Sequence, residues 1–333
     1  MPVIRTHQST YSETSSTLTS SDHWDHFLAR AGYKRSWHRV KPGLYRLGTP
    51  SPEAPVFVTS NYTLSFDALR SNLAGMDAFI LVLDTFGVNV WCAAGKGTFG
   101  TKELVHRVQD TKLGDVVNHR VLILPQLGAP GVAAHEVKKA TGFRVEYGPV
   151  RAEDIPAYMR TRAATPDMRR VKFPIRDRAV LIPVDFVGTF RYMMGAGLAG
   201  WLLGGWWFAF AAVVSILAGT VLFPLLLPWL PFREFSLKGF VLGLLIMLPF
   251  AIWNIQSGSG SPMHLALNLA ALLLIFPAVT AFVSLNFTGA TPFTSKTGVR
   301  LEMNRFIPLM VWFSGIGLIA AIVNRVIQLA GVA

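Results

Sequence analysis

Hydrophobic residues are distributed unevenly along this chain of 333 residues. In the first 180 residues, short apolar runs alternate with polar, amphipathic segments. From Phe186 onward, long apolar stretches dominate and charged residues nearly vanish. Short apolar runs between helical patterns are typical of an α/β domain, and stretches of about 20 apolar residues are typical of membrane-spanning helices. The pattern therefore predicts two parts of different nature.

The first part alternates between predicted strands and helices. The run Ala78–Leu83 is apolar throughout, which favours a strand covered on both faces. The other predicted strands are Val56–Val58, Val121–Leu124 and Arg144–Tyr147, with a short extended piece at Val88–Trp91. The predicted helices are Leu64–Leu73, Thr101–Lys112 and Val132–Thr141. This alternation predicts a Rossmann-like α/β domain with a parallel sheet, in which ligands bind beyond the carboxyl ends of the strands.

The second part predicts an all-α transmembrane domain of five helices. The spans begin and end near Val187–Leu203, Trp206–Leu230, Gly239–Ile255, Met263–Leu285 and Phe306–Val323. Loops with basic residues alternate with uncharged loops, as the positive-inside rule requires. We therefore expect a multi-pass protein of the cytoplasmic (inner) membrane with the α/β domain in the cytoplasm and the C-terminus outside. Few charges lie within the spans, which favours a role mainly as an anchor.

Composition and charge divide the chain further. The formal net charge is +12 and the mean hydropathy is +0.41. The basic residues cluster before the first span, which favours membrane topology over nucleic-acid binding. We expect a disordered Ser/Thr-rich leader over residues 1–40, the α/β domain over 41–165, a basic linker over 166–185 and the membrane domain over 186–330.

Cys92 is the only cysteine, so it can form neither an intrachain disulfide nor a multi-cysteine metal site. A lone cysteine is most often a small buried hydrophobe. Here the neighbours Ala93, Ala94 and Gly95 are small enough to let a large flat ligand approach, and Lys96 adds a cation that favours a thiolate. The segment also follows a predicted strand, where ligands of such sheets bind.

Two other interpretations of this segment are weaker. Gly95-Lys96-Gly97 fails the P-loop pattern, because Val90 stands where the first glycine is needed and Gly97 stands where Ser or Thr is needed. Cys92 with His106 or His135 would suit a cysteine hydrolase, but no specific motif supports that pairing.

The octet Asn89–Lys96, Asn-Val-Trp-Cys-Ala-Ala-Gly-Lys, resembles in full the signature of the HgcA family, the membrane corrinoid proteins of mercury methylation. Similar agreement extends over roughly residues 40–330. It includes segments that begin at Pro42, Asn61, Gly97, Leu124, Gly219, Pro228 and Asn286. The family's soluble domain is similar to that of the corrinoid iron–sulfur protein of the acetyl-CoA pathway.

The resemblance implies a corrinoid-dependent methyltransferase that passes a methyl group from cobalt to Hg(II), giving methylmercury. Cys92 would be the lower axial ligand of cobalt in a base-off, cobalamin-type cofactor. The implied partners are a ferredoxin-like protein with two 4Fe-4S clusters (HgcB type) as electron donor and a methyltetrahydrofolate-linked methyl donor. The expected cofactor contacts are Asn89, Val90, Trp91, Cys92, Ala93, Ala94, Gly95, Lys96 and Gly97, with Thr59, Asn61 and Gln126 at strand ends.

Two alternatives stay open at this stage. The same chemistry could serve another acceptor, such as a metalloid or a thiol in one-carbon metabolism. The chain could also be a membrane-bound corrinoid carrier without turnover of its own.

Overall fold

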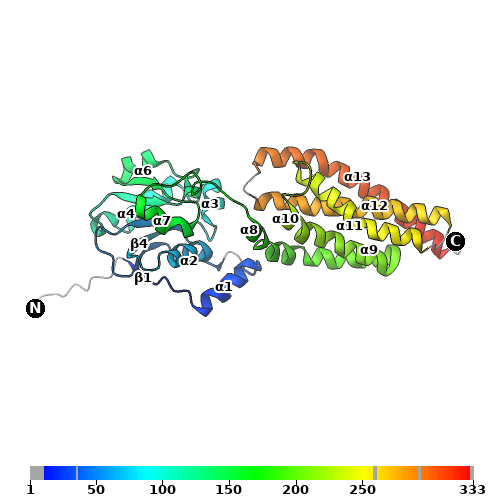
Figure 1. The fold of residues 1–333 in the computed structure, drawn as a ribbon, viewed down its shortest axis with the longest axis horizontal. Coiled ribbons are helices and arrows are strands. Elements are labelled where there is room, and N and C mark those ends of the chain that lie inside the picture. Colours follow the sequence, from blue (N-terminus) through cyan, green and yellow to red (C-terminus); the bar gives the residue numbers. More distant parts are fainter. Residues whose placement is uncertain (1–10, 35–36, 258–260, 292–293, 331–333) are drawn as a thin grey trace, which may run out of the picture. The chain divides into compact units, whose positions relative to one another are not determined.

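The computed structural model describes residues 11–34, 37–257, 261–291 and 294–330. The chain divides into two compact units, each considered by itself (Figure 1). The α/β unit comprises Met1–Ala29 and Tyr33–Val171, and the helical unit comprises Arg30–Gly32 and Lys172–Ala333. The predicted linker over 166–185 contains this division.

A six-stranded sheet forms the centre of the α/β unit. Its strands are β1 (Ser12–Thr14), β2 (Gly43–Leu47), β3 (Val56–Ser60), β4 (Ala78–Leu83), β5 (Val121–Leu124) and β6 (Arg144–Tyr147), in the order β1-β2-β4-β3-β5-β6. The strands predicted at β3, β4, β5 and β6 are confirmed, and they run parallel to one another.

The prediction of a wholly parallel, Rossmann-like sheet is not confirmed, because β2 runs antiparallel to β4 and β1 pairs with β2. The structure is therefore a mixed α/β sheet. The sequence contains little sign of these two strands, because β1 reads Ser-Glu-Thr and β2 contains Arg46 among its five residues. β1 lies at the edge of the sheet and β2 lies next to it, and both are partly exposed, so neither has the continuous apolar run that marks a strand buried on both faces.

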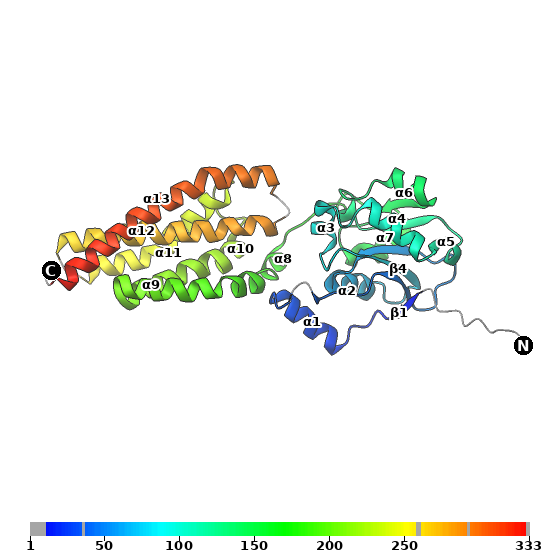
Figure 2. The same ribbon diagram turned by 180° about the vertical axis from the view of Figure 1, so that it is seen from behind.

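Helices cover both faces of the sheet (Figures 1 and 2). On one face Phe57, Ile80 and Ile123 pack against α2 (Thr63–Asn72) and α7 (Ile155–Thr161). On the other face, Val58, Leu81 and their neighbours form a second core with four helices, namely α3 (Val90–Lys96), α4 (Thr101–Asp110), α5 (Leu113–Val116) and α6 (Ala134–Thr141). The sheet is thus buried on both sides, as the unbroken apolar run of β4 predicts.

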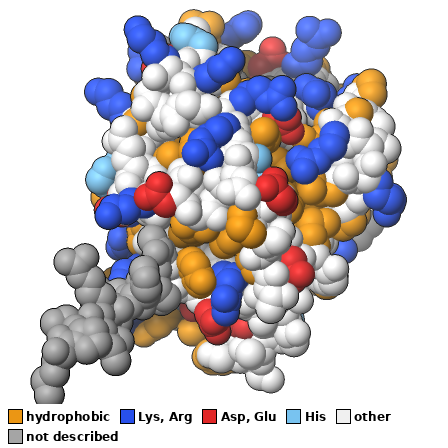
Figure 3. All heavy atoms as spheres, turned by 90° about the vertical axis from the view of Figure 1, so that its left-hand side faces the viewer, with side chains coloured by type: hydrophobic (Ala, Val, Ile, Leu, Met, Phe, Trp, Pro, Cys, Tyr) orange, Lys and Arg blue, Asp and Glu red, His pale blue; other side chains and the backbone are white. Residues whose placement is uncertain are grey.

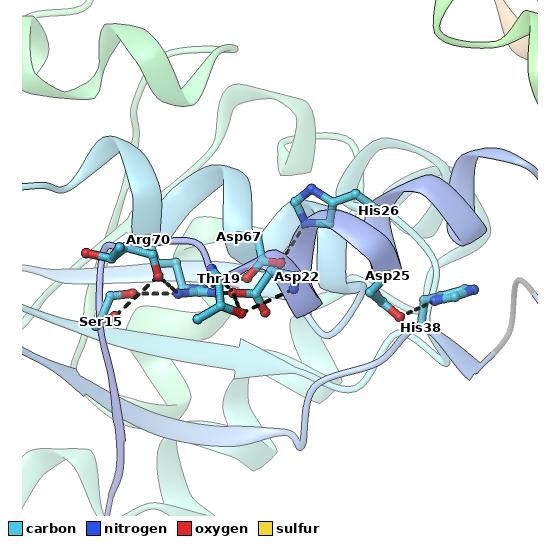
Figure 4. A network of polar contacts seen from close by, with 9 residues as sticks. Ser15, Thr19, Asp22, Asp25, His26, His38, Asp67 and Arg70 are labelled. Atoms are coloured by element: carbon cyan, nitrogen blue, oxygen red, sulfur yellow. Dashed lines mark hydrogen bonds and ion pairs between the residues drawn. The ribbon is translucent and has the colours of Figure 1, made fainter.

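The predicted disordered leader is wrong for the residues that form β1 and α1 (Ser20–Arg30). Residues 1–10 lie outside the described part of the chain. Arg70 on α2 holds this N-terminal segment in place (Figure 4). Its guanidinium donates to Asp67 at 2.6 Å and to Asp22 on α1 at 2.9 Å, and it also donates to the carbonyl oxygens of Ser15 and Thr17. A polar leader can therefore dock through buried ion pairs, without the apolar periodicity that sequence analysis seeks.

Two histidines extend the same network. His26 on α1 contacts the buried Asp67 carboxylate at 2.7 Å, and His38 contacts Asp25 at 2.6 Å. The pKa of Asp22 is lowered, first by the hydrogen bond from the Thr19 backbone N–H and also by the Arg70 guanidinium. α1 is therefore fixed to the unit along one face, by polar contacts.

Within its described residues, the helical unit contains four segments that are long and apolar enough to span a membrane. They are Ile175–Leu226, Phe235–Gln256, Pro262–Ala290 and Thr297–Leu329. The helices within them are α8 (Ile175–Ala179), α9 (Ile182–Leu217), α10 (Phe223–Leu226), α11 (Phe235–Gln256), α12 (Pro262–Asn286) and α13 (Lys296–Leu329). Four of these segments are found, rather than the five predicted spans.

The difference lies in the first segment, which is 52 residues long and has non-helical backbone at Gly204 and Gly205. A Cβ placed on Gly200 would lie 2.7 Å from the carbonyl oxygen of Phe208. In a continuous helix, residues eight apart would be separated by about 12 Å along the axis. The chain therefore reverses direction at the glycine pair, and the two halves of α9 lie side by side.

Replacing Arg70 by Met would remove the guanidinium from the buried Asp67 carboxylate and from the partly exposed Asp22 carboxylate. Breaking such a buried pair costs about 3–5 kcal/mol, so we expect α1 and β1 to detach. Hydrogen exchange across residues 12–30 should rise strongly. Arg144→Met is the matched control, because Arg144 pairs with Glu146 at the surface. Unchanged exchange in Arg70→Met would contradict this role.

Because the pKa of Asp22 is lowered in the folded protein, its contribution to stability is complete above its ordinary value of 3.8. It is lost as the pH falls through the lower folded value. Exchange across α1 in the unaltered protein should therefore rise in acid, and Arg70→Met should remove only the part of that pH dependence that comes from the guanidinium, because the larger effect of the Thr19 backbone N–H remains.

Candidate functional site

The carboxyl ends of β3, β4, β5 and β6 share one edge of the sheet. The chain leaves β3 through α2 toward β4 on one side, whereas it leaves β5 through α6 toward β6 on the other. Adjacent strands whose connections diverge in this way leave a crevice at their carboxyl ends, where α/β sheets bind ligands.

A cavity of about 360 Å³ lies at this position. Its walls come from the ends of β3 and β5, from α2, from the start of α3 and from the segment after β6. The lining is mostly apolar, with Thr59, Ser65 and Asn89 among its polar members. Of the residues predicted to contact a cofactor, Thr59, Asn89, Val90 and Trp91 line it, whereas Cys92 does not.

Cys92 lies in the first turn of α3, which begins at Val90. The prediction of an extended piece over Val88–Trp91 is therefore wrong for Val90 and Trp91. The physical reason is a cap: the Asn89 side-chain oxygen accepts a hydrogen bond from the Cys92 backbone N–H at 2.9 Å. Gly97 ends the helix with a φ of 82°, a left-handed conformation that favours glycine.

The helical geometry separates the small residues around Cys92 into two faces. Ala93 and Ala94 are buried in the core, so they do not border the sulfur as the sequence suggested. Their small size serves packing, since a Cβ on Gly131 would lie 3.0 Å from the Ala94 Cα. Gly95 and Lys96 are exposed, one turn beyond the partly exposed Cys92, and a Cβ on Gly95 would meet no atom within 4 Å. The open surface beside the sulfur is therefore the face formed by residues 92, 95 and 96.

The loop before α6 is held against α3. Its Val132 carbonyl accepts a hydrogen bond at 2.6 Å from the hydroxyl of Tyr147, and burial raises the pKa of that phenol. The Ala133 backbone N–H donates to Thr101 at 2.8 Å. These contacts fix the loop whose glycine allows the close approach to Ala94.

Asn61, at the end of β3, organises the loop that leads to α3. Its buried side-chain oxygen accepts hydrogen bonds from the backbone N–H groups of Thr85 and Gly87 and from the Thr85 hydroxyl, at 2.9–3.1 Å. Its side-chain nitrogen donates to Asp84 at 3.0 Å. These bonds occupy most of the capacity of the amide. We therefore revise its expected role from cofactor contact to positioning of the loop.

Gln126 starts the short 3-10 helix Gln126–Gly128 after β5. Its side-chain oxygen is buried and has no hydrogen-bond partner within the described residues. Such an atom usually has a partner in a folded protein, so it is available to a ligand. Gln126 therefore remains a candidate contact, together with Thr59.

Sequence reasoning missed Phe86 in the β4–α3 loop and Arg39, which lies against that loop. Phe86 has a φ of 58° and an exposed ring, although a bulky residue rarely adopts that conformation. Arg39 lies against the same loop, since a Cβ on Gly87 would be 2.9 Å from its Cγ. The only sequence signal was the Phe86-Gly87 pair before Asn89, which marks a turn.

The described residues contain no group of three His, Cys, Asp or Glu side chains able to hold a metal ion. Within the described residues, neither His106 nor His135 forms a hydrogen bond with Cys92, whose backbone N–H donates to the Asn89 side chain. The thiol of Cys92 is therefore the distinctive donor of this site.

Comparison with known proteins places this site in a corrinoid-protein-like domain. The family described as CO dehydrogenase/acetyl-CoA synthase delta subunit matches residues 33–159. The acetyl-CoA decarbonylase/synthase complex subunit gamma of Methanopyrus kandleri is 34% identical over 127 residues, which are 38% of this chain and 27% of that protein. The corrinoid/iron-sulfur protein large subunit of Moorella thermoacetica is 27% identical over 129 residues, 38% of this chain and 28% of that protein.

This chain thus spans about a quarter of the length of these relatives. The matched region contains β2 to β6, the cavity and Cys92. The helical unit lies outside it. The similarity to these relatives therefore concerns the α/β unit and its cofactor chemistry. It gives no information about the apolar helices.

Replacing Asn61 by Ala would leave buried N–H groups of the β4–α3 loop without an acceptor. Each such loss costs about 1–3 kcal/mol. A total of about 3 kcal/mol corresponds to roughly 100-fold faster hydrogen exchange over residues 85–92, since about 1.4 kcal/mol is a factor of ten. Asn72→Ala is the matched control, because the Asn72 amide donates only to an exposed carbonyl on its own helix. Equal exchange in the two variants would contradict the positioning role.

Proposed function

We propose that this protein is a membrane-bound, corrinoid-dependent methyltransferase of the HgcA type, which passes a methyl group to Hg(II) to give methylmercury. One observation carries the proposal: the sole thiol of the chain lies in the first turn of a helix, at the ligand edge of a corrinoid-protein-like domain. The complete HgcA signature over Asn89–Lys96 supports the choice of acceptor.

The residues present fit a corrinoid. Cys92 is a partly exposed sulfur donor, and the surface beside Gly95 is open. The adjacent cavity has apolar walls, and the unpartnered Gln126 oxygen provides a further polar contact. The cavity is too small to enclose a whole corrinoid, so we assign it to the flexible nucleotide tail, with Thr59 and Gln126 as contacts.

Cys92 would hold cobalt at its lower axial position, in place of the cofactor's own base. A bound corrinoid would supply the methyl group, and the negative charge of a Cys92 thiolate would favour its transfer with the bonding electrons to the electrophilic Hg(II). The cofactor would then be left two electrons more oxidised than the state that accepts a methyl group. The Asn89 cap fixes the backbone at Cys92, and the backbone dipole at the start of a helix favours negative charge there. Trp91, 37% exposed, borders both the cavity and the open face.

The proposed reaction needs an electron donor and a methyl donor that this chain does not provide. A single cysteine cannot hold an iron–sulfur cluster, which needs several thiolates. Reduction of the cofactor therefore requires an external donor, for which we propose the ferredoxin-like protein with two 4Fe-4S clusters. With Cys92 assigned to cobalt, no second thiol of this chain remains to hold Hg(II), so delivery of mercury by the same partner is consistent with the proposal. The methyl donor would be methyltetrahydrofolate-linked.

The membrane arrangement we propose has five crossings. It counts the two halves of the 52-residue apolar segment separately, because the chain reverses at Gly204 and Gly205. The α/β unit would then lie in the cytoplasm with the basic loops, and the C-terminus would lie outside.

The role of the thiolate can be tested with two substitutions. Cys92→Ala should abolish methylmercury formation in cells. Cys92→His keeps a ligand without the negative charge, so it should retain corrinoid but lose most of the methylation. Methylmercury production and the visible spectrum of the purified protein measure the two effects. Full activity in Cys92→Ala would refute axial ligation, and full activity in Cys92→His would refute the need for an anionic sulfur.

The five-crossing topology can be tested by labelling single cysteines, introduced into Cys92→Ala, with a membrane-impermeant maleimide. Arg233→Cys and Thr294→Cys should be labelled only from the cytoplasmic side. Trp206→Cys and Ser257→Cys should be labelled only from outside. Labelling of positions 206 and 233 from the same side would show that the first apolar segment crosses once.

A further inference from the structure

An aromatic surface lies on the outer face of α1. The rings of Trp24 and Phe27 are 62% and 59% exposed, and they stack with their centroids 5.4 Å apart. The opposite face of the same helix carries Asp22 and His26, which the network around Arg70 and Asp67 holds (Figure 4). The polar contacts therefore fix this helix with its apolar side facing outward.

Two more exposed aromatic rings follow α1. Tyr33 and Trp37 are 55% and 72% exposed. The Lys34 ammonium lies 5.5 Å from the centroid of the first ring and 4.5 Å from that of the second. Large exposed rings beside a cation are unusual on a surface that faces only water. We call these four residues the α1 aromatic surface: Trp24 and Phe27 on α1, and Tyr33 and Trp37 after it. Their exposure indicates that a binding partner covers them.

Its composition matches a membrane–water interface. Tryptophan and tyrosine collect at the level of the lipid headgroups, because one end of each ring is apolar and the other is polar. Interfacial helices combine such rings with lysine and arginine. Five basic residues and two acidic residues lie between positions 20 and 41, namely Arg30, Lys34, Arg35, Arg39 and Lys41 against Asp22 and Asp25.

The two aspartates neutralise little of the positive charge of the five basic residues, because each aspartate is already paired with another side chain. Asp22 is paired with Arg70, and Asp25 is in contact with His38. Lys and Arg side chains are also prominent on the face of the α/β unit seen in Figure 3, so the positive charge of this unit is not confined to the segment around α1. The basic residues beside α1 are of the kind that anionic lipids attract.

Covalent linkage favours a bilayer over a protein as the partner. The α/β unit ends at Val171, and the first apolar segment begins at Ile175. A short link of this kind keeps the unit permanently near the lipid surface at high effective concentration. Even weak interfacial contacts can then be occupied most of the time.

We propose that the α1 aromatic surface binds the headgroup region of an anionic bilayer and so restrains the α/β unit at the membrane. The inference rests on the membrane insertion proposed above and is independent of the chemistry of Cys92. The Arg70 network acts here as the support that presents the rings.

The test uses the full chain in lipid nanodiscs, with a single environment-sensitive fluorophore on Phe27→Cys in Cys92→Ala. Nanodiscs of phosphatidylcholine, with and without phosphatidylglycerol, carry a nitroxide quencher near the headgroups. We expect a blue-shifted emission and loss of fluorescence by quenching, both larger with phosphatidylglycerol. Trp37→Cys is a second, independent labelling site that should behave alike.

Two control labels give the scale. Lys139→Cys, exposed on α6, should stay unquenched. Leu309→Cys, exposed within the last apolar segment, should be quenched by acyl-chain nitroxides in any nanodisc. Quenching of Leu309 without quenching of positions 27 and 37 would overturn the inference alone. Lack of quenching at Leu309 would instead show that the proposed membrane insertion fails.

A protein partner would give a different result. If a second copy of this chain covered the rings, the label at position 27 would be shielded in neutral nanodiscs as well. The shielding would then disappear when each nanodisc holds one chain. That outcome, without lipid quenching, would overturn the proposal.

Discussion

The side-chain amide of Asn61 is the interaction on which the candidate site depends. It joins the end of β3 to the loop after β4, where its oxygen accepts two backbone N–H groups and one hydroxyl. That loop turns through the left-handed residues Phe86 and Gly87 and delivers Asn89 to the start of α3. Asn89 then caps the backbone at Cys92. Two asparagine side chains in succession thus fix the position of the only thiol.

The central fold of the α/β unit could be predicted because its signal is local. The apolar runs of β3, β4 and β5 are short, unbroken and buried on both faces, so they predict strands whatever their neighbours are. The docked N-terminal segment could not be predicted in this way. Its position depends on Arg70, which is about 50 residues away and contacts Asp22, Ser15 and Thr17. A long-range ion pair leaves no periodicity in the sequence.

The structure of the candidate site was also predictable only in part. The residue types around Cys92 and its place after a strand directed the sequence analysis to this segment. It placed Val90 and Trp91 in an extended piece, because the cap that starts the helix depends on the orientation of Asn89. The glycines and alanines were expected to leave space for a ligand. In the structure Ala93 and Ala94 are buried against the loop at Gly131, and Gly95 remains on the open side. Only helical geometry separates these two uses of small residues.

The helical unit adds a physical constraint to the chemistry proposed for the α/β unit. The described residues form four segments that are long and apolar enough to span a membrane, which is the basis for the bilayer insertion proposed above. In the arrangement proposed above, a membrane would hold the α/β unit at a surface, and the proposed electron donor would have to reach it there. A restricted orientation of the α/β unit would then keep the open face of α3 accessible for more of the time. The exposed rings of α1 and the basic residues that follow it would supply the apolar area and the charge for such a restraint. Under this proposal, a domain with one thiol and an external reductant would gain efficiency from contacts that lie outside its candidate site.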